Sequence, residues 1–244
     1  MLKLIELGDG LQVYALSVME ARFMYDEIFK EDCYGVDLPE QPLVIDVGAN
    51  IGMFAIFIKQ RYPDAEVLSF EPMPESASLL RRNIALHQLD RVTVHELALG
   101  SEAERNVSFA FYPMLPGHST RYPETKVLPM TQMAADVEPK VVEQMYRARE
   151  VNARVDRLAT FLPPDRRVDL LKVDVEGAEA DVLLGIDTHQ WPQIQRAILE
   201  VADIDGQLAV VCDILRDNGL TPAVRQAPLT EAENVTYMVH ATRG

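Results

Sequence analysis

The sequence predicts an α/β protein with a doubly wound, mostly parallel sheet, and three observations support this fold class. Apolar runs that suit buried strands alternate with segments that suit helices along most of the chain. The first core strand, residues 43–46, is followed by a glycine turn that leads into a helix. Hydrophobic residues make up 48% of the 244 positions, which is enough for a sizeable core. Repeated units of this kind connect through right-handed crossovers.

Residues 1–42 precede the first core strand and are predicted to form an N-terminal cap segment. Residues 11–16 alternate weakly between apolar and polar side chains, as a strand does. Ser17 is the expected N-cap of a helix over residues 18–29, with Glu20 three residues later completing a capping box. The segment is expected either to cover the ligand side of the domain or to pack as an extension without touching a ligand.

The central elements are predicted from the alternation of apolar strands and helical segments. The expected strands span residues 43–46, 66–70, 92–97, 168–173 and 197–201. The expected helices span residues 53–61 and 75–87, a segment ending near residue 184, and residues 206–217. Residues 223–226 and 235–240 are expected to form a terminal strand pair.

The regular alternation stops between the third and fourth core strands. An insertion this long with turn-forming residues is usually a functional loop or lid. We therefore expect a lid over about residues 101–160 within a catalytic domain that spans residues 43–244. Its predicted pieces are a strand at 107–112, a turn-rich stretch at 113–123, a helix at 139–149 and a strand at 151–155.

The turn after the first core strand has the sequence Asp46-Val-Gly-Ala-Asn-Ile-Gly52. Gly48 and Gly52 allow the backbone to come close to a ligand, and the following helix directs its first N–H groups there. The spacing differs from the G-x-G-x-x-G pattern of dinucleotide sites, and Asp46 would repel a pyrophosphate. A nicotinamide-dependent oxidoreductase is therefore the less favoured alternative. A carboxylate at Asp46 suits a ligand that carries an ammonium group.

The second core strand ends at another acid, Glu71, which precedes Pro72. A carboxylate at that place can accept two hydrogen bonds from ribose hydroxyls. Adenosine combined with an amino-acid ammonium describes S-adenosylmethionine, which is the cofactor that the two motifs favour. The residues expected to contact it are Asp46, Gly48, Ala49, Asn50, Gly52, Glu71, Pro72, Asp174 and, through its backbone near the adenine, Ala98.

Three segments resemble the FkbM family of S-adenosylmethionine-dependent methyltransferases. They are residues 46–52, residues 70–72 and the stretch 171–179, which contains Asp-Val-Glu-Gly-Ala-Glu. The resemblance runs from about residue 40 to residue 202. It implies a class I methyltransferase fold and, usually, O-methylation of a polyketide, peptide or sugar product or its carrier-bound intermediate. The family's loop resembles Pro-Gly-Asn-Ser-Thr, whereas this chain has His118 in the third place.

Methylation of an alkyl hydroxyl benefits from a general base, because a hydroxyl is a weak nucleophile. His118, in the turn-rich stretch, and Glu176, after the fourth core strand, are the candidate catalytic residues. Alternatively, Asp174, Glu176 and Glu200 could bind Mg²⁺, which would acidify a bound hydroxyl, but a metal is not favoured. Methylation of nitrogen or carbon stays open as an alternative to O-methylation.

Composition narrows the partners and the compartment. The 38 acidic and 23 basic side chains give a net charge of −15, which repels phosphate backbones and disfavours nucleic acid as a substrate. Two cysteines form no disulfide framework, and we find no signal peptide and no apolar run of about 18 residues. We expect a cytoplasmic enzyme that does not bind membranes and acts on a small molecule, free or bound to a carrier protein. The sequence does not predict its oligomeric state.

Overall fold

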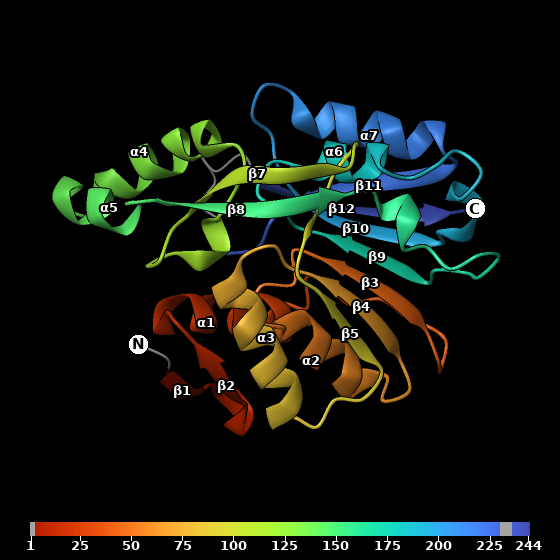
Figure 1. Ribbon diagram of the computed structural model, residues 1–244, viewed down its shortest axis with the longest axis horizontal. Coiled ribbons are helices and arrows are strands. Elements are labelled where there is room, and N and C mark those ends of the chain that lie inside the picture. The colour runs from red at the N-terminus through yellow and green to blue at the C-terminus, as the bar shows by residue number, and fades with distance from the viewer. Residues whose placement is uncertain (1–2, 230–235) are drawn as a thin grey trace.

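The computed structural model describes residues 3–229 and 236–244 (Figure 1). Its central sheet contains β3 (Leu43–Val47), β4 (Glu66–Phe70), β5 (Val92–His95), β9 (Leu170–Val173), β10 (Arg196–Ala202), β11 (Leu220–Gln226) and β12 (Thr236–Arg243). Their order is β11-β12-β10-β9-β3-β4-β5. Among these described strands only β12 runs antiparallel to its neighbours. The predicted fold class, a doubly wound and mostly parallel sheet, is confirmed.

Helices cover both faces of this sheet, as Figure 1 shows. The helices α1 (Val18–Tyr25), α2 (Met53–Arg61) and α3 (Pro74–Leu86) pack on one face, and α6 (Glu179–Leu184) and α7 (Gln207–Asp217) pack on the other. Successive strand residues point to opposite faces, so Val44 belongs to the first of these two cores and Ile45 to the second. Burial on both faces explains why the strands are almost continuously apolar.

The N-terminal segment packs on the face that carries α2 and α3. It begins with a hairpin of β1 (Lys3–Glu6) and β2 (Gln12–Ala15), of which the sequence predicted only the second strand. Ser17 caps α1 by accepting a hydrogen bond from the Glu20 backbone N–H at 3.3 Å, as predicted. The predicted helix over 18–29 is only partly right, because the chain changes at Asp26–Lys30 to one π-helical turn.

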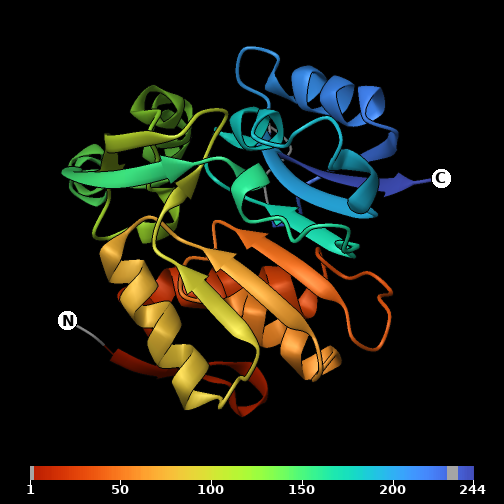
Figure 2. The same cartoon turned by 45° about the vertical axis from the view of Figure 1, so that its right-hand side comes forward.

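The insertion between β5 and β9 builds its own small sheet with the order β6-β8-β7. Its elements are β6 (Ala98–Leu99), β7 (Glu104–Phe111), α4 (Val127–Asp136), α5 (Pro139–Met145) and β8 (Arg149–Asp156). In Figures 1 and 2 the parallel strands point their arrowheads toward this insertion, which lies at the carboxyl edge of the central sheet. The edge at which a ligand site is expected in such a sheet therefore faces the insertion.

Two predicted boundaries in this part were wrong, and one helix was missed. The strand predicted over 92–97 ends at His95, because the next residues leave the central sheet and pair with β8 at Ala98. The helix predicted over 139–149 ends at Met145, because Arg149 already belongs to β8. Helix α4 was not predicted at all. The terminal strand pair is confirmed, although Val235, its predicted start, lies outside the described residues.

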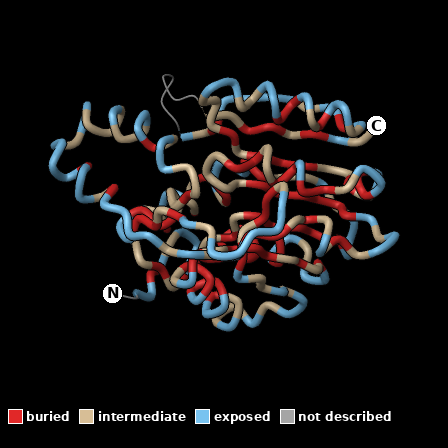
Figure 3. Tube along the Cα trace, turned by 45° about the horizontal axis from the view of Figure 1, so that its top comes forward, coloured by how far each residue is buried: buried red, intermediate tan, exposed pale blue. Residues whose placement is uncertain are grey.

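Burial differs between the central sheet and the insertion. Figure 3 shows buried backbone concentrated in the central layers, whereas the arm of α4 and α5 is mostly exposed or half-buried. None of the residues of α4 is buried. Among the described helices, none combines the length and the apolar character needed to cross a lipid bilayer.

Candidate active site

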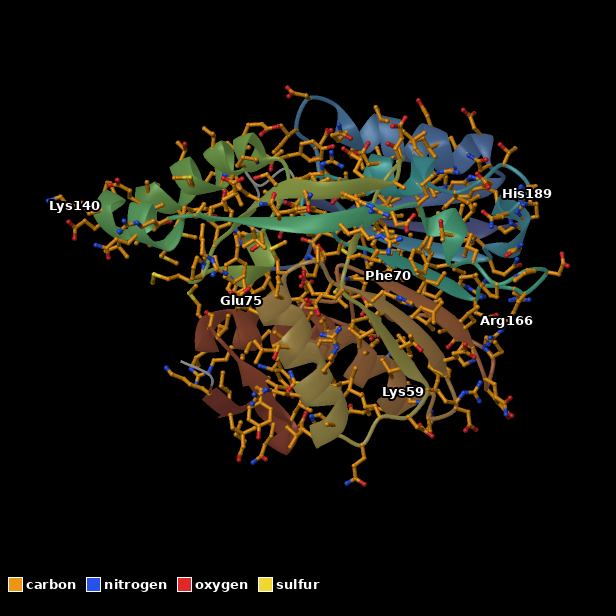
Figure 4. All side chains as sticks on the ribbon, viewed as in Figure 1. Lys59, Phe70, Glu75, Lys140, Arg166 and His189 are labelled. Atoms are coloured by element: carbon orange, nitrogen blue, oxygen red, sulfur yellow. The ribbon has the colours of Figure 1, made fainter. Side chains whose placement is uncertain are left out.

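The turn after β3 is tightly packed against the end of β9. Gly48 has φ +80°, and a Cβ built on it would lie 1.7 Å from the Asp174 carbonyl oxygen. The backbone N–H groups of Gly48 and Ala49 both donate to the Phe70 carbonyl oxygen, at 3.0 and 2.9 Å. Only glycine fits at position 48. Through these contacts the turn connects the carboxyl ends of β3, β4 and β9. Figure 4 shows Phe70 in the centre of the molecule.

Asp46 forms a buried ion pair with Lys172. Its side chain is 0% exposed, and the Lys172 Nζ lies 3.3 Å from its Oδ1 and 3.4 Å from the Asp174 Oδ2. Lys172 also donates to the Gly48 carbonyl oxygen at 2.8 Å. Burial alone would lower the pKa of Lys172, but the two carboxylates raise it above its usual value, so the lysine stays charged. The ammonium partner predicted for Asp46 would have to displace this lysine.

Glu71 joins the glycine turn to the start of α3. Its Oε2 accepts from the Asn50 backbone N–H at 2.9 Å, and its Oε1 accepts from the Met73 N–H at 2.8 Å. Burial raises the pKa of Glu71 to about 7, against the effect of these two hydrogen bonds. A carboxylate oxygen has two acceptor positions, so Glu71 keeps capacity for further donors. The neighbouring Asn50 Oδ1 is buried and has no hydrogen-bond partner among the described residues.

His118 lies in a loop that is tied to three parts of the molecule. Its Nδ1 is 2.9 Å from the Tyr146 hydroxyl at the end of α5. The preceding Gly117 N–H donates to the Glu20 carboxylate of α1 at 2.9 Å, and Thr120 donates to the Glu176 carbonyl oxygen at 2.8 Å. Burial lowers the pKa of His118, so its imidazole is neutral near pH 7.

Glu176 differs from His118 in its charge state. It forms an ion pair with Lys126, whose side chain is buried. Burial alone would raise the pKa of Glu176, but Lys126 and His118 hold it below its usual value. Glu176 is therefore an ionised partner of a lysine, whereas His118 offers a neutral nitrogen. Of the two predicted bases, Glu176 is already paired with a lysine and His118 is not.

The structure adds side chains that the sequence analysis did not assign to the site, among them Tyr34, Glu27 and Lys172. Tyr34, which is 1% exposed, directs its hydroxyl to the Glu200 Oε2 at 3.3 Å and the Asp174 Oδ2 at 3.5 Å. Glu27, on the π-helical turn, is 6% exposed. Lys172 could have been noticed from sequence, since a lysine inside an otherwise apolar strand is unusual. No comparable local signal marks Tyr34.

The remaining residues of the predicted site are Gly52, Pro72 and Ala98. Gly52 has φ +88° and precedes α2, and Pro72 follows Glu71 toward α3. Ala98 pairs with Val155 in the small sheet rather than extending β5. Among the described residues no group of three or more histidine, cysteine, aspartate or glutamate side chains is placed to hold a metal ion. The alternative Mg²⁺ set of Asp174, Glu176 and Glu200 is thus not assembled.

Comparisons with known proteins agree with this geometry. Residues 46–220 match the family described as the methyltransferase FkbM domain. The chain is 38% identical over 245 residues to "Methyltransferase 1" of Beauveria bassiana, across 98% of this chain and 97% of that protein. It is 34% identical over 239 residues to the "31-O-demethyl-FK506 methyltransferase FkbM" of Streptomyces tacrolimicus, across 92% and 91%. The solved methyltransferase FkbM of Methylobacillus flagellatus shares the fold, with a TM-score of 0.53 and 14% identity over 89% of this chain and 47% of that one.

Proposed function

We propose, from the premise that the chain belongs to the FkbM family of S-adenosylmethionine-dependent methyltransferases, that it methylates a hydroxyl group of a small molecule. The family membership and the class I methyltransferase fold agree with the sequence prediction. They also set aside the alternative of a nicotinamide-dependent oxidoreductase. The single observation that carries the choice of a hydroxyl is the half-buried imidazole of His118, which is neutral near pH 7 and whose Nδ1 lies 2.9 Å from the Tyr146 hydroxyl.

The residues at the carboxyl edge suit the methyl donor. The buried Asn50 Oδ1 without a partner and the spare acceptor positions of Glu71 can take the donor's hydroxyl hydrogens. We assign donor binding to the predicted set of Asp46, Gly48, Ala49, Asn50, Gly52, Glu71, Pro72, Ala98 and Asp174. In this arrangement Asp46 acts by holding Lys172 against the turn. The donor supplies a methyl group that is already activated by its sulfonium, so the protein mainly has to position and desolvate the reactants.

His118 is suited to take the proton of the acceptor hydroxyl. One of its two nitrogens, Nδ1, is occupied by the Tyr146 hydroxyl. If Nδ1 carries the hydrogen and donates it to the tyrosine oxygen, Nε2 keeps a lone pair for the acceptor. Lys126 keeps Glu176 ionised nearby, which favours the imidazolium that forms when His118 accepts the proton.

The insertion supplies the surroundings of the acceptor. Tyr112, Leu115, Val142 and Tyr146 form a buried apolar cluster behind His118, whereas Met114 is 51% exposed. We propose that this insertion is the lid of the site and that an apolar acceptor approaches along it. A polyketide, peptide or sugar product fits this proposal, whether free or bound to a carrier protein. The Streptomyces tacrolimicus relative is named for an O-demethyl substrate, which supports an oxygen acceptor.

The test is transfer of a carbon-13-labelled methyl group from the donor to a panel of hydroxyl, amine and activated-carbon acceptors. The carbon chemical shift of the product identifies the atom that was methylated. We expect methyl ethers, and we expect His118→Gln to abolish most of the transfer while the donor still binds. Products methylated only on nitrogen or only on carbon would show that the enzyme is an N- or a C-methyltransferase instead. Absence of donor binding would overturn the proposal altogether.

A further inference from the structure

We propose that Glu20, on α1, is a positioning residue that holds the loop of His118 against the glycine turn at Asn50. The inference rests on the proposed function, because it gives Glu20 a part in that reaction. The Glu20 carboxylate accepts the Gly117 N–H at 2.9 Å, and Gly117 directly precedes His118. The two partners are 97 positions apart in the sequence, so this contact joins the N-terminal segment to the insertion.

The contact is not the one that the place of Glu20 in its helix predicts. Glu20 is the third residue of α1 after the N-cap Ser17, where a glutamate completes a capping box by accepting the N–H of the N-cap. Ser17 does accept from the Glu20 N–H, but the hydrogen bond to the Glu20 carboxylate comes from Gly117. The side chain of Glu20 therefore serves a partner outside its own helix.

The loop itself leaves the Gly117 N–H for Glu20. In the 3₁₀ turn over residues 116–118, the N–H groups of His118 and Ser119 donate to carbonyl oxygens of the loop, at 3.0 and 3.2 Å. The first residue of the turn is a proline, which has no N–H, so Gly117 carries the donor that the turn does not use. Because backbone N–H groups away from water are nearly always paired, the acceptor on α1 fixes where the loop lies.

The space around Gly117 brings the glycine turn to the same place. A Cβ built on Gly117 would lie 3.3 Å from the Glu20 Oε1 and 3.3 Å from the Asn50 Nδ2. The Asn50 Nδ2 also lies 3.5 Å from the sulfur of Met24, one turn further along α1. Gly117 is therefore held between a residue of the helix and a residue of the glycine turn, and a larger side chain there would have to displace one of them.

On its other side the loop is attached to the segment after β9. Thr120 donates to the Glu176 carbonyl oxygen at 2.8 Å, and Lys126 pairs with the Glu176 carboxylate. These contacts follow His118 in the sequence, whereas the contact of Glu20 precedes it. His118 thus lies between two attachments, and loss of the Glu20 acceptor would release one of them. Displacement of a reacting group by about 1 Å can cost a large part of the rate, because the reacting atoms must be aligned.

Glutamine and methionine at position 20 separate the hydrogen bond from the shape of the side chain. Burial raises the pKa of Glu20 to about 8, although the Gly117 hydrogen bond lowers it, and the charge of Glu176 adds to the rise. Glu20 therefore holds a proton at pH 7. A protonated carboxyl accepts through its oxygen, as the amide of glutamine does, whereas methionine has a similar length and no oxygen.

The first measurement is hydrogen exchange of the Gly117 N–H by NMR, in protein labelled with nitrogen-15 at its 12 glycines. Its signal is the one that Gly117→Ala removes. At one pH and temperature we expect about tenfold faster exchange in Glu20→Met and in Glu20→Ala, and little change in Glu20→Gln. Glu31→Met is the matched control, because it makes the same change at an exposed position of the N-terminal segment. Unchanged exchange without the acceptor would overturn the proposal.

The second measurement is methyl transfer at saturating donor. We expect Glu20→Met to lower turnover about tenfold or more, while affinity for S-adenosylhomocysteine, the demethylated donor, stays within about twofold. Glu20→Gln should recover most of the turnover. In a chain that already carries His118→Gln, Glu20→Met should cost nothing further, since a positioning residue acts through the base. Additive losses, or a loss of donor affinity as large as the loss of turnover, would overturn the positioning role.

Failure of this inference and failure of the proposed function give different results. If the parent chain methylates no hydroxyl acceptor, the proposed function fails, while exchange of the Gly117 N–H still shows whether Glu20 holds the loop. If the parent chain forms methyl ethers and Glu20→Met keeps full turnover, the proposed function stands and Glu20 has no part in it.

Discussion

The carboxyl edge of the central sheet and the insertion meet at one site, but they are held in different ways. The edge depends on an ion pair that is almost entirely buried, with Asp46 at 0% and Lys172 at 3% exposure. The insertion arm contains a helix, α4, without a single buried residue. His118 is fixed through individual polar contacts, to Tyr146 and through its loop to Glu20 and Glu176. We infer from this difference that the methyl donor is bound by rigidly packed residues. The acceptor is bound by a segment whose sequence can vary with little loss of stability.

The largest expected effect is on the packed side. Gly48→Ala places a Cβ 1.7 Å from the Asp174 carbonyl oxygen, at φ +80°. We expect destabilisation by about 3 kcal/mol or more and loss of donor binding, because the backbone of β9 cannot move away from the sheet. Gly206→Ala is a matched control, since Gly206 has φ +80° as well but nothing within 4 Å of the added carbon. Denaturant unfolding should show a cost of only about 1 kcal/mol there. Equal costs at both glycines would mean that the close approach does not matter.

The second effect concerns the insertion. His118→Gln should lower turnover about a hundredfold or more while donor affinity stays within about twofold. The parent enzyme should lose activity as the pH falls through the pKa of His118, which burial holds below its usual value. His189→Gln is a suitable control, because Figure 4 shows His189 at the far side of the molecule from the α5 arm that carries Lys140. A variant at position 118 that loses donor affinity as strongly as turnover would place His118 in the donor site instead.

The same contrast explains what the sequence could and could not predict. The bounds of α2 and β4 were predicted correctly, because a glycine turn and a buried apolar run leave a strong local pattern. Helix α4 was missed because Pro129 lies inside it and because its apolar side chains, Met130, Met133 and Ala134, are only partly buried where they pack on the Tyr112 cluster. The partners of Asp46 and His118 are Lys172 and Tyr146, which are distant in sequence. No local spacing of residues predicts such contacts.

A smaller effect should separate positioning from chemistry within the insertion. Tyr146→Phe removes the hydroxyl 2.9 Å from the His118 Nδ1. We expect about a tenfold loss of turnover and a shift of the acidic limb of the pH profile to lower pH. The shift follows because a tyrosine oxygen that accepts from Nδ1–H stabilises the imidazolium more than the neutral ring. A shift to higher pH would show that the tyrosine donates instead, which would leave Nε2 protonated and remove it as the base.

Tyr112→Phe is the matched control for this change. Tyr112 packs edge-to-face on Tyr146 with ring centroids 5.5 Å apart, in the same apolar cluster. Among the described residues its hydroxyl has no hydrogen-bond partner, so its removal should leave the pH profile in place. A shift of the same size in both variants would indicate that the cluster as a whole, rather than the Tyr146 hydroxyl, sets the pKa of His118.

The smallest expected effect is that of metal removal. If a neutral imidazole from the insertion accepts the proton, the carboxylates of the sheet edge do not need a metal to acidify the hydroxyl. Treatment with a chelator should therefore leave turnover within about twofold of the untreated enzyme, measured in the same methyl-transfer assay. A loss that added Mg²⁺ restores would instead bring Asp174, Glu176 and Glu200 together around the ion. The carboxyl edge of the sheet would then both bind the donor and activate the acceptor, and the insertion would not supply the base.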